Sequence, residues 1–192
     1  MAFIDLLSKI VASVESLNNI HALRFEEKLY TSYQKRKVKT DIVRLINKCS
    51  LRTAYMIMAT SWGKYQILGY NLYNKLNYDK PIGYYLNEPD EQDFIFIEYI
   101  KKFFQTPDVE NYARKIINEL DQLKELKYFH GVLNFKDVLV KHFDNIQFTI
   151  QFIRVYNGAI FPSASFQNYL LRMLHAYEKF KKEVSLWPKK KD

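Results

Sequence analysis

The chain has 192 residues, of which 48% are hydrophobic, 26% charged and 16% aromatic. This balance is ordinary for a globular protein, and the length suits one domain that buries a core without disulfides. The formal net charge of +8 favours anionic partners, among them nucleic acid, membrane surfaces and cell-wall polymers. With only five Gly and five Pro residues, a fold of many tight β-turns is disfavoured and a helical one is expected.

The sequence gives little support for a bound metal, a cofactor or a membrane span. Cys49 is the only cysteine, so the chain can form neither an internal disulfide nor a Cys-based zinc site. The histidines lack the spacing of metal ligands, and we expect no metal and no cofactor; they are His21, His130, His142 and His175. Asp5 and Lys9 interrupt the apolar N-terminus, unlike a signal peptide, and no stretch reaches the roughly 20 apolar residues of a membrane span. We therefore expect synthesis in a host cytoplasm and no stable membrane insertion.

The first predicted helix is amphipathic and ends near Glu15 and Ser16. Its apolar face is formed by Ile4, Leu7, Val11 and Val14. Asn18 and Asn19 follow as turn formers, so the helix is expected to stop beside a carboxylate.

Shorter elements follow. Residues 22–30 fit either a short helix or an extended segment, and residues 34–39 form a basic run expected in solvent. Asp41 is expected to cap a short helix that continues to Asn47, and Ser50 is expected to cap a helix over residues 51–59.

The remaining chain alternates connections and helices. Residues 63–69 form a compact segment between two glycines, and a Tyr/Asn-rich connection continues to Pro89. Helices are predicted over residues 89–104, 107–128, 145–155 and 163–184. Gly158 is expected as a left-handed C-cap. We expect one mostly helical domain over residues 1–184 and a basic tail over residues 185–192.

Glu15 is a candidate catalytic acid because it directly follows an apolar helical face. Burial against apolar neighbours disfavours the charged form of a carboxyl group and raises its pKa, which keeps it protonated for acid catalysis. Its position alone, however, favours a solvated residue at a helix end.

Two further segments suit a polar ligand. Residues 60–71 read Thr-Ser-Trp-Gly-Lys-Tyr-Gln-Ile-Leu-Gly-Tyr-Asn, and aromatic faces and amides of this kind bind the apolar faces and hydroxyls of sugars. A helix end followed by a packed turn explains the same residues. Residues 155–158, Val-Tyr-Asn-Gly, alone are a common helix-stop signal.

Taken in order, these segments resemble the goose-type lysozyme and lytic transglycosylase superfamily, and more closely the N-acetylmuramidase family of phage endolysins. The matching pieces are Val14-Glu15-Ser16, Leu23-Arg24-Phe25-Glu26, the stretch from Ser61 to Asn71, and Tyr156-Asn157-Gly158. The resemblance spans about Ile4 to Phe180, nearly the whole chain. The sequence departs from the family in several places. Leu17-Asn18-Asn19 stands where the family usually has a glycine, the loop between Glu15 and Phe25 is short, and Tyr70 stands where Phe is usual.

The resemblance implies a mainly α, lysozyme-like domain with room for a small β-hairpin region. It implies an endolysin-type hydrolase that cleaves the β-1,4 bond between N-acetylmuramic acid and N-acetylglucosamine in peptidoglycan glycan strands. Glu15 is then the general acid, and Glu26 either activates water or forms a salt bridge that orients the cleft. Glu27 is a weaker choice for the second carboxylate. The implied substrate-binding residues are Ser61, Trp62, Gln66, Tyr70, Tyr156 and Asn157, although core packing explains Trp62 better. We expect a monomer that acts on the wall, in the periplasm or outside the cell, and binds no nucleic acid.

Two alternatives stay open. A lytic transglycosylase would use the same acid but leave 1,6-anhydromuramic acid ends. A non-enzymatic basic protein would bind nucleic acid or form part of a phage particle. Against the latter, the basic residues are scattered rather than set in one stripe, and the sequence contains no recognised DNA-reading motif.

Overall fold

The computed structural model describes residues 2–103, 152–159 and 163–185. Contacts along the chain divide it into two compact units, Met1–Tyr99 and Ile100–Asp192, which are described separately. This division does not test the predicted boundary after residue 184. The helix predicted over residues 107–128, most of the one over residues 145–155, and residues 186–192 of the basic tail lie outside the described residues.

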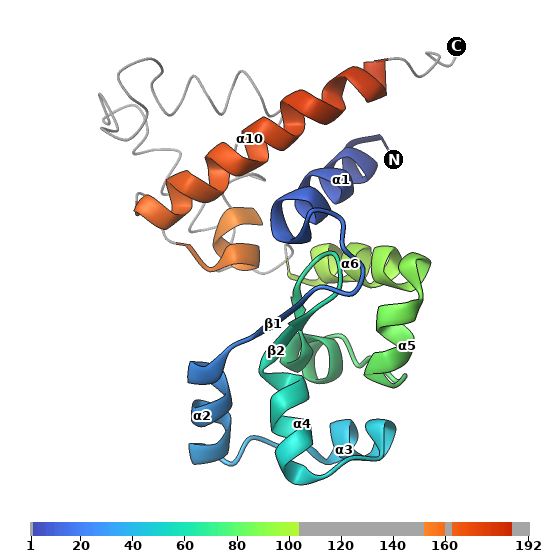
Figure 1. The fold of residues 1–192 in the computed structure, drawn as a ribbon, viewed down its shortest axis with the longest axis vertical. Helices are drawn as coiled ribbons and strands as arrows, with labels where there is room; N and C mark the ends of the chain where they lie inside the picture. The colour runs from blue at the N-terminus through green and yellow to red at the C-terminus, as the bar shows by residue number, and fades with distance from the viewer. Residues whose placement is uncertain (1, 104–151, 160–162, 186–192) are drawn as a thin grey trace. The chain divides into compact units, whose positions relative to one another are not determined.

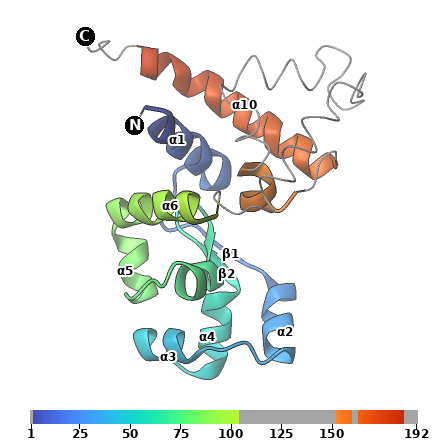
Figure 2. The ribbon, with the colours of Figure 1, turned by 180° about the vertical axis from the view of Figure 1, so that it is seen from behind.

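The first unit is mostly helical and contains a small sheet (Figure 1). Its helices are α1 (Ala2–Ser16), α2 (Glu27–Lys35), α3 (Asp41–Asn47), α4 (Leu51–Met58), the π-helix η1 (Asn71–Lys75), α5 (Ile82–Asn87) and α6 (Pro89–Phe103), of which α6 ends beyond the unit boundary. Its strands are β1 (Leu23–Phe25), β2 (Thr60–Trp62) and β3 (Ile67–Leu68). Viewed from behind in Figure 2, α3 and α4 lie side by side at the end of the unit opposite α6. The predicted mainly α fold with a small β-hairpin region is confirmed.

The sheet is antiparallel in the order β1-β2-β3, with β2 in the centre. Arg24 of β1 lies opposite Ser61 of β2, and Ser61 lies opposite Leu68 of β3. The compact segment that begins at Gly63 is thus the turn and second strand of a hairpin. The segment over residues 22–30 begins as β1 and continues as α2, so both of its possible structures occur.

The predicted start of α4 is confirmed, and that of α3 is wrong. The Ser50 hydroxyl accepts a hydrogen bond from the Thr53 main-chain N–H at 3.2 Å, as expected of an N-cap. In α3 the N-cap is Thr40, whose side chain makes no capping bond, and Asp41 is the first helical residue. The carboxylate of Asp41 still lies in the first turn, where the helix dipole favours a negative charge.

The predicted Tyr/Asn-rich connection before Pro89 is more ordered than expected. It contains η1 and α5, and three of its tyrosines are buried, namely Tyr73, Tyr78 and Tyr85. The rings of Tyr78 and Tyr85 meet edge to face, with centroids 5.8 Å apart. Because these large side chains bury much apolar area, packing orders a segment whose composition resembles that of a loop.

Apolar residues of α1 follow the predicted face. Leu7, Val11 and Val14 are buried, and Ile10 beside them is 2% exposed. In the part of the chain that the structure describes, no helix is long and apolar enough to cross a membrane.

The second unit is described for the π-helix η3 (Ile153–Asn157) and for α10 (Ala164–Ser185), which contact each other. Gly158 ends η3 with a φ of 74°, so the predicted left-handed cap is confirmed. One face of α10 is largely buried: Phe166, Leu170, Met173 and Phe180 are buried, and Tyr177 is half-buried.

Candidate active site

Glu15 lies in the last turn of α1 and is half-buried, directly after the buried Val14. The hydroxyl of Ser16, the last residue of the helix, donates a hydrogen bond to the main-chain carbonyl of Lys64 at 2.8 Å. Lys64 belongs to the turn between β2 and β3. The helix end that carries Glu15 is therefore fixed to the hairpin that carries three of the six predicted sugar-binding residues.

The chain leaves α1 through two non-glycine residues in the left-handed region. Leu17 has a φ of 55° and Asn18 a φ of 65°. Asn tolerates this region, whereas a leucine there costs roughly 1–2 kcal/mol because its Cβ approaches the following carbonyl. Leu17 is also 86% exposed, so packing of its side chain does not offset the strain. The chain thus makes this turn without a glycine, although the family that the sequence resembles usually has one there.

Gln66 holds the hairpin turn together. Its φ is 51°, and its side-chain Nε2 donates to the carbonyls of Gly63 at 2.9 Å and Ala22 at 3.1 Å. An amide nitrogen carries two hydrogens, so these two bonds use both of them. Gln66 therefore joins the turn to the residue that precedes β1.

Gln92 of α6 is fully buried and connects three segments. Its Nε2 donates to the carbonyls of Ile20 and Tyr85, both at 3.0 Å. Its Oε1 accepts from the main-chain N–H of Lys64 at 2.8 Å. A Cβ added to Gly63 would lie 2.5 Å from that Oε1, so the glycine is required by space as well as by its φ of +73°. Buried amides this fully bonded fix the relative positions of the groups they join.

Asp93, the next residue of α6, binds the same turn. Its Oδ1 lies 2.8 Å from the ammonium of Lys64 and accepts a hydrogen bond from the hydroxyl of Tyr65. The Tyr65 ring is stacked on Phe96, with centroids 4.2 Å apart. Burial raises the pKa of the Tyr65 hydroxyl, the bond to Asp93 raises it further, and a bond to Ser8 of α1 partly offsets these effects. Tyr65 therefore stays a neutral donor at ordinary pH.

Glu26 forms an ion pair at the start of α2. Its Oε1 lies 2.7 Å from Nε of Arg24, and the two side chains are 36% and 58% exposed. At such exposure a pair contributes about 0–1 kcal/mol to stability, so its main effect is to orient the carboxylate. The main-chain N–H of Glu26 donates to the carbonyl of Ala59 at 2.8 Å, which fixes the junction of β1 and α2 to the end of α4.

Ser61 and Trp62 of β2 and Tyr70, the N-cap of η1, differ in exposure. Ser61 is 3% exposed on the central strand, which leaves little of it for a ligand. The half-buried Trp62 donates its indole N–H to the carbonyl of Ile57 in α4 at 2.9 Å, in agreement with the packing role favoured for it. Tyr70 is half-buried, and its ring centroid lies 5.5 Å from that of Tyr33.

Tyr156 and Asn157 belong to the second unit. The half-buried Tyr156 ring is stacked on Phe152 with centroids 4.8 Å apart, and Asn157 is the exposed last residue of η3. The other matching segments all lie in the first unit, where Ser16 is bonded to the hairpin turn and β1 is paired with β2.

The described residues include no group of three or more His, Cys, Asp or Glu side chains that could hold a metal ion. Residues that sequence reasoning missed are Gln92 and Asp93, whose partners in the turn are 28 residues away in the chain. In the local sequence these residues are only two polar positions before the apolar run of α6. That pattern does not indicate which residues they bind.

The chain is similar to an endolysin of Enterobacteria phage PRD1, with 29% identity over 141 residues that cover 69% of this chain and 90% of that protein. No family model matches the chain, and no solved structure matches it significantly. Since the similarity extends over nearly all of the phage protein, it concerns a whole domain rather than one short motif.

Proposed function

We propose that this protein is a peptidoglycan-degrading enzyme of the endolysin type. The observation that carries the proposal is the similarity to the phage PRD1 endolysin over 90% of that protein. The mainly α fold with a small antiparallel sheet is consistent with a lysozyme-like domain. The net charge of +8 suits a substrate in an anionic wall.

The specific reaction we propose is N-acetylmuramidase hydrolysis, with Glu15 as the general acid. Glu15 donates its proton to the glycosidic oxygen that leaves from N-acetylmuramic acid, and water captures the oxocarbenium-like centre. Two features support this assignment: Glu15 is half-buried at a helix end, and Ser16 holds that end against the hairpin turn. A fixed acid is what general acid catalysis requires, because the donor must lie within hydrogen-bond reach of the leaving oxygen.

Glu26 is the proposed second carboxylate, and its pairing with Arg24 gives a direct way to separate its two possible roles. If Glu26 activates water, Glu26→Gln removes nearly all activity, whereas Arg24→Gln leaves the base in place and costs much less. If the ion pair only orients the cleft, the two variants lose similar, small amounts. Initial rates of wall clearing by the two variants distinguish these outcomes.

The sugar-binding residues are also a proposal. They are Ser61, Trp62, Gln66, Tyr70, Tyr156 and Asn157. Of these, Ser61 is buried, Asn157 is exposed and the other four are half-buried. Both amide hydrogens of Gln66 are used in bonds that hold the turn, so a contact between Gln66 and a sugar would be made by its side-chain oxygen Oε1.

The test of the proposed function is digestion of purified peptidoglycan. We expect the protein to clear a suspension and to release fragments that end in reducing N-acetylmuramic acid. Fragments lighter by one water, with 1,6-anhydro ends, would instead assign a lytic transglycosylase. Absence of soluble glycan fragments, together with salt-dependent DNA binding, would favour a non-enzymatic protein.

A further inference from the structure

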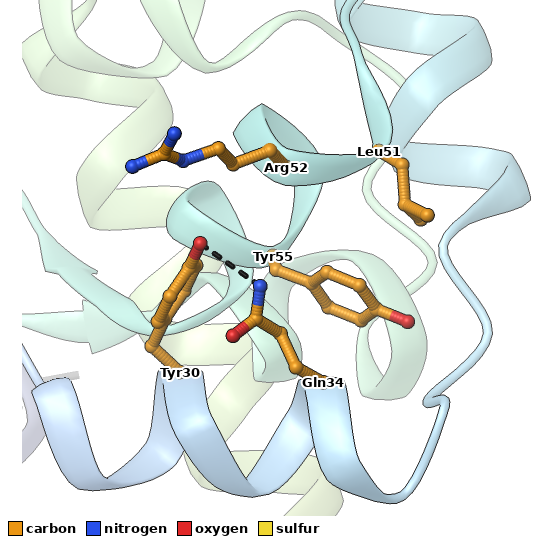
Figure 3. Close-up of a pocket in the computed structure, with 5 residues that line it drawn as sticks. All are labelled: Tyr30, Gln34, Leu51, Arg52 and Tyr55. Carbon is orange, nitrogen blue, oxygen red and sulfur yellow. Dashed lines mark hydrogen bonds between the residues drawn. The ribbon is translucent and has the colours of Figure 1, made fainter.

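A pocket of about 520 Å³ lies between α2 and α4. Tyr30 and Gln34 contribute to it from α2, and Leu51, Arg52 and Tyr55 contribute from α4 (Figure 3). Its volume lies in the range of roughly 300–1,000 Å³ that is typical of small-ligand sites.

The α2 side of the pocket is held in one arrangement. Nε2 of Gln34 donates to the hydroxyl of Tyr30 at 3.0 Å, and Figure 3 shows both side chains rising from α2 toward α4. The pocket combines two aromatic rings with Leu51, which is 48% exposed, so it offers apolar surface to a ligand.

Arg52 gives the pocket its charge. The side chain is exposed, and it forms no hydrogen bond or ion pair within the described residues. The pocket lining contains no acidic residue, so the guanidinium is not neutralised there. A guanidinium presents its N–H groups in a planar fork that matches two oxygens of a carboxylate or a phosphate, so the pocket suits an anionic group.

The pocket is connected to the sheet by an exposed aromatic surface. Phe25, at the end of β1, is 48% exposed, and its ring centroid lies 5.6 Å from that of Tyr30. Tyr30 follows Glu26 by one helical turn, since its N–H donates to the Glu26 carbonyl at 3.0 Å. The rings of Phe25 and Tyr30 thus extend from the end of β1 to the pocket.

We propose that this pocket binds the peptide stem of peptidoglycan, with Arg52 paired to a stem carboxylate. The inference rests on the proposed function and extends it to substrate selection. The N-acetylated glycan backbone is neutral where its lactyl group is joined to the peptide, so the charge that Arg52 selects lies on the stem. The apolar rings and Leu51 suit the aliphatic parts of a short peptide.

The test is a binding titration of the wild-type protein with two soluble ligands. One is the N-acetylglucosaminyl-N-acetylmuramyl disaccharide that carries its peptide stem, which lacks the bond to be cleaved. The other is the same disaccharide without the peptide, with its lactyl group capped as a simple amide so that it carries no charge. We expect Arg52→Gln to weaken binding of the peptide-bearing ligand about tenfold and to leave the peptide-free ligand unaffected. Arg52→Lys keeps the charge without the fork and should give an intermediate loss.

Arg44→Gln on α3 is the matched control, because it removes one exposed arginine that is not in the pocket lining. An equal loss with Arg44→Gln, an equal loss for both ligands, or no loss with Arg52→Gln would overturn the assignment of the pocket. If the wild type cleaves peptidoglycan in any of these cases, the proposed function stands and only the pocket is wrong. If the wild type neither cleaves peptidoglycan nor binds either disaccharide, both proposals are wrong.

Discussion

The hydroxyl of Ser16 donates to the main-chain carbonyl of Lys64 with 2.8 Å between the two oxygens, and it joins the end of α1 to the β2–β3 turn. Lys64 is held from the other side by α6, because its N–H donates to Gln92 and its ammonium pairs with Asp93. The residue beside the proposed acid thus belongs to a network that extends across the first unit.

Ser16→Ala should weaken both the fold and the activity. The variant leaves the Lys64 carbonyl without this donor, so the free energy of unfolding should fall by about 1 kcal/mol. Activity should fall about tenfold, because the helix end that carries Glu15 loses an attachment and small displacements of a catalytic group are costly. Ser13→Ala, one turn earlier in α1, is the control. Equal activity of Ser16→Ala and Ser13→Ala would show that the attachment does not position Glu15.

Leu17→Gly should stabilise the protein. Glycine adopts a φ of +55° freely, so the variant removes roughly 1–2 kcal/mol of backbone strain, while its greater freedom in the unfolded chain returns about 0.5–1 kcal/mol. A net gain of about 0.5–1 kcal/mol is expected in chemical denaturation. Leu17→Ala removes the same exposed apolar side chain and keeps the strain, so it should give no gain. A similar gain from both variants would assign the effect to the side chain instead.

Three glycine substitutions should rank by their surroundings. Gly83→Ala meets open space within α5 and should be neutral or slightly stabilising. Gly158→Ala also meets open space but has a φ of +74°, so it should cost about 1–2 kcal/mol. Gly63→Ala adds contact with Gln92 to the same strain and should cost about 3 kcal/mol or more. Equal costs for Gly63→Ala and Gly158→Ala, measured by denaturant unfolding, would show that Gln92 moves aside.

Stability should fall in alkali above the pKa of an ordinary tyrosine. Burial raises the pKa of Tyr73 and of Tyr33 from 10.0 to about 12. Below pH 10 the hydroxyls of Tyr73 and Tyr33 are neutral in both the folded and the unfolded chain, so their contribution to the free energy of unfolding does not change with pH. Between pH 10 and 12 the unfolded chain loses the protons first, so stability declines, by up to roughly 2–3 kcal/mol for each group.

The variant Tyr73→Phe tests this decline. It should reduce the slope of unfolding free energy against pH between 10 and 12, although it also removes the bonds from the hydroxyl to Asn47 and Lys80. Identical slopes for Tyr73→Phe and the wild type would contradict the role of burial.

Local patterns predicted the elements that depend on local forces. The α1 apolar face, the Ser50 cap and the left-handed Gly158 follow from spacing and turn chemistry within a few residues. Asp41 was misplaced by one position, since Thr40 and Asp41 are both acceptable before a helix and local sequence does not choose between them.

The supporting contacts of the candidate site could not be predicted in the same way. Gln92 reaches Lys64 across 28 residues of chain and Ile20 across 72, and no spacing rule connects positions so far apart. Likewise, sugar binding by Gln66 was predicted from the sequence, but the two hydrogen bonds by which Gln66 closes the hairpin turn were not.

The most direct test of the central claim is the muralytic rate of Glu15→Gln beside the wild type, with Glu88→Gln at the exposed end of α5 as the matched control. The substitution keeps the shape of the side chain and removes its proton donor. We expect Glu15→Gln to lose at least about a hundredfold in rate of peptidoglycan clearing, with an unchanged melting temperature, and Glu88→Gln to keep wild-type activity. A folded Glu15→Gln protein that clears the wall as fast as the wild type would contradict the assignment of Glu15 as the acid.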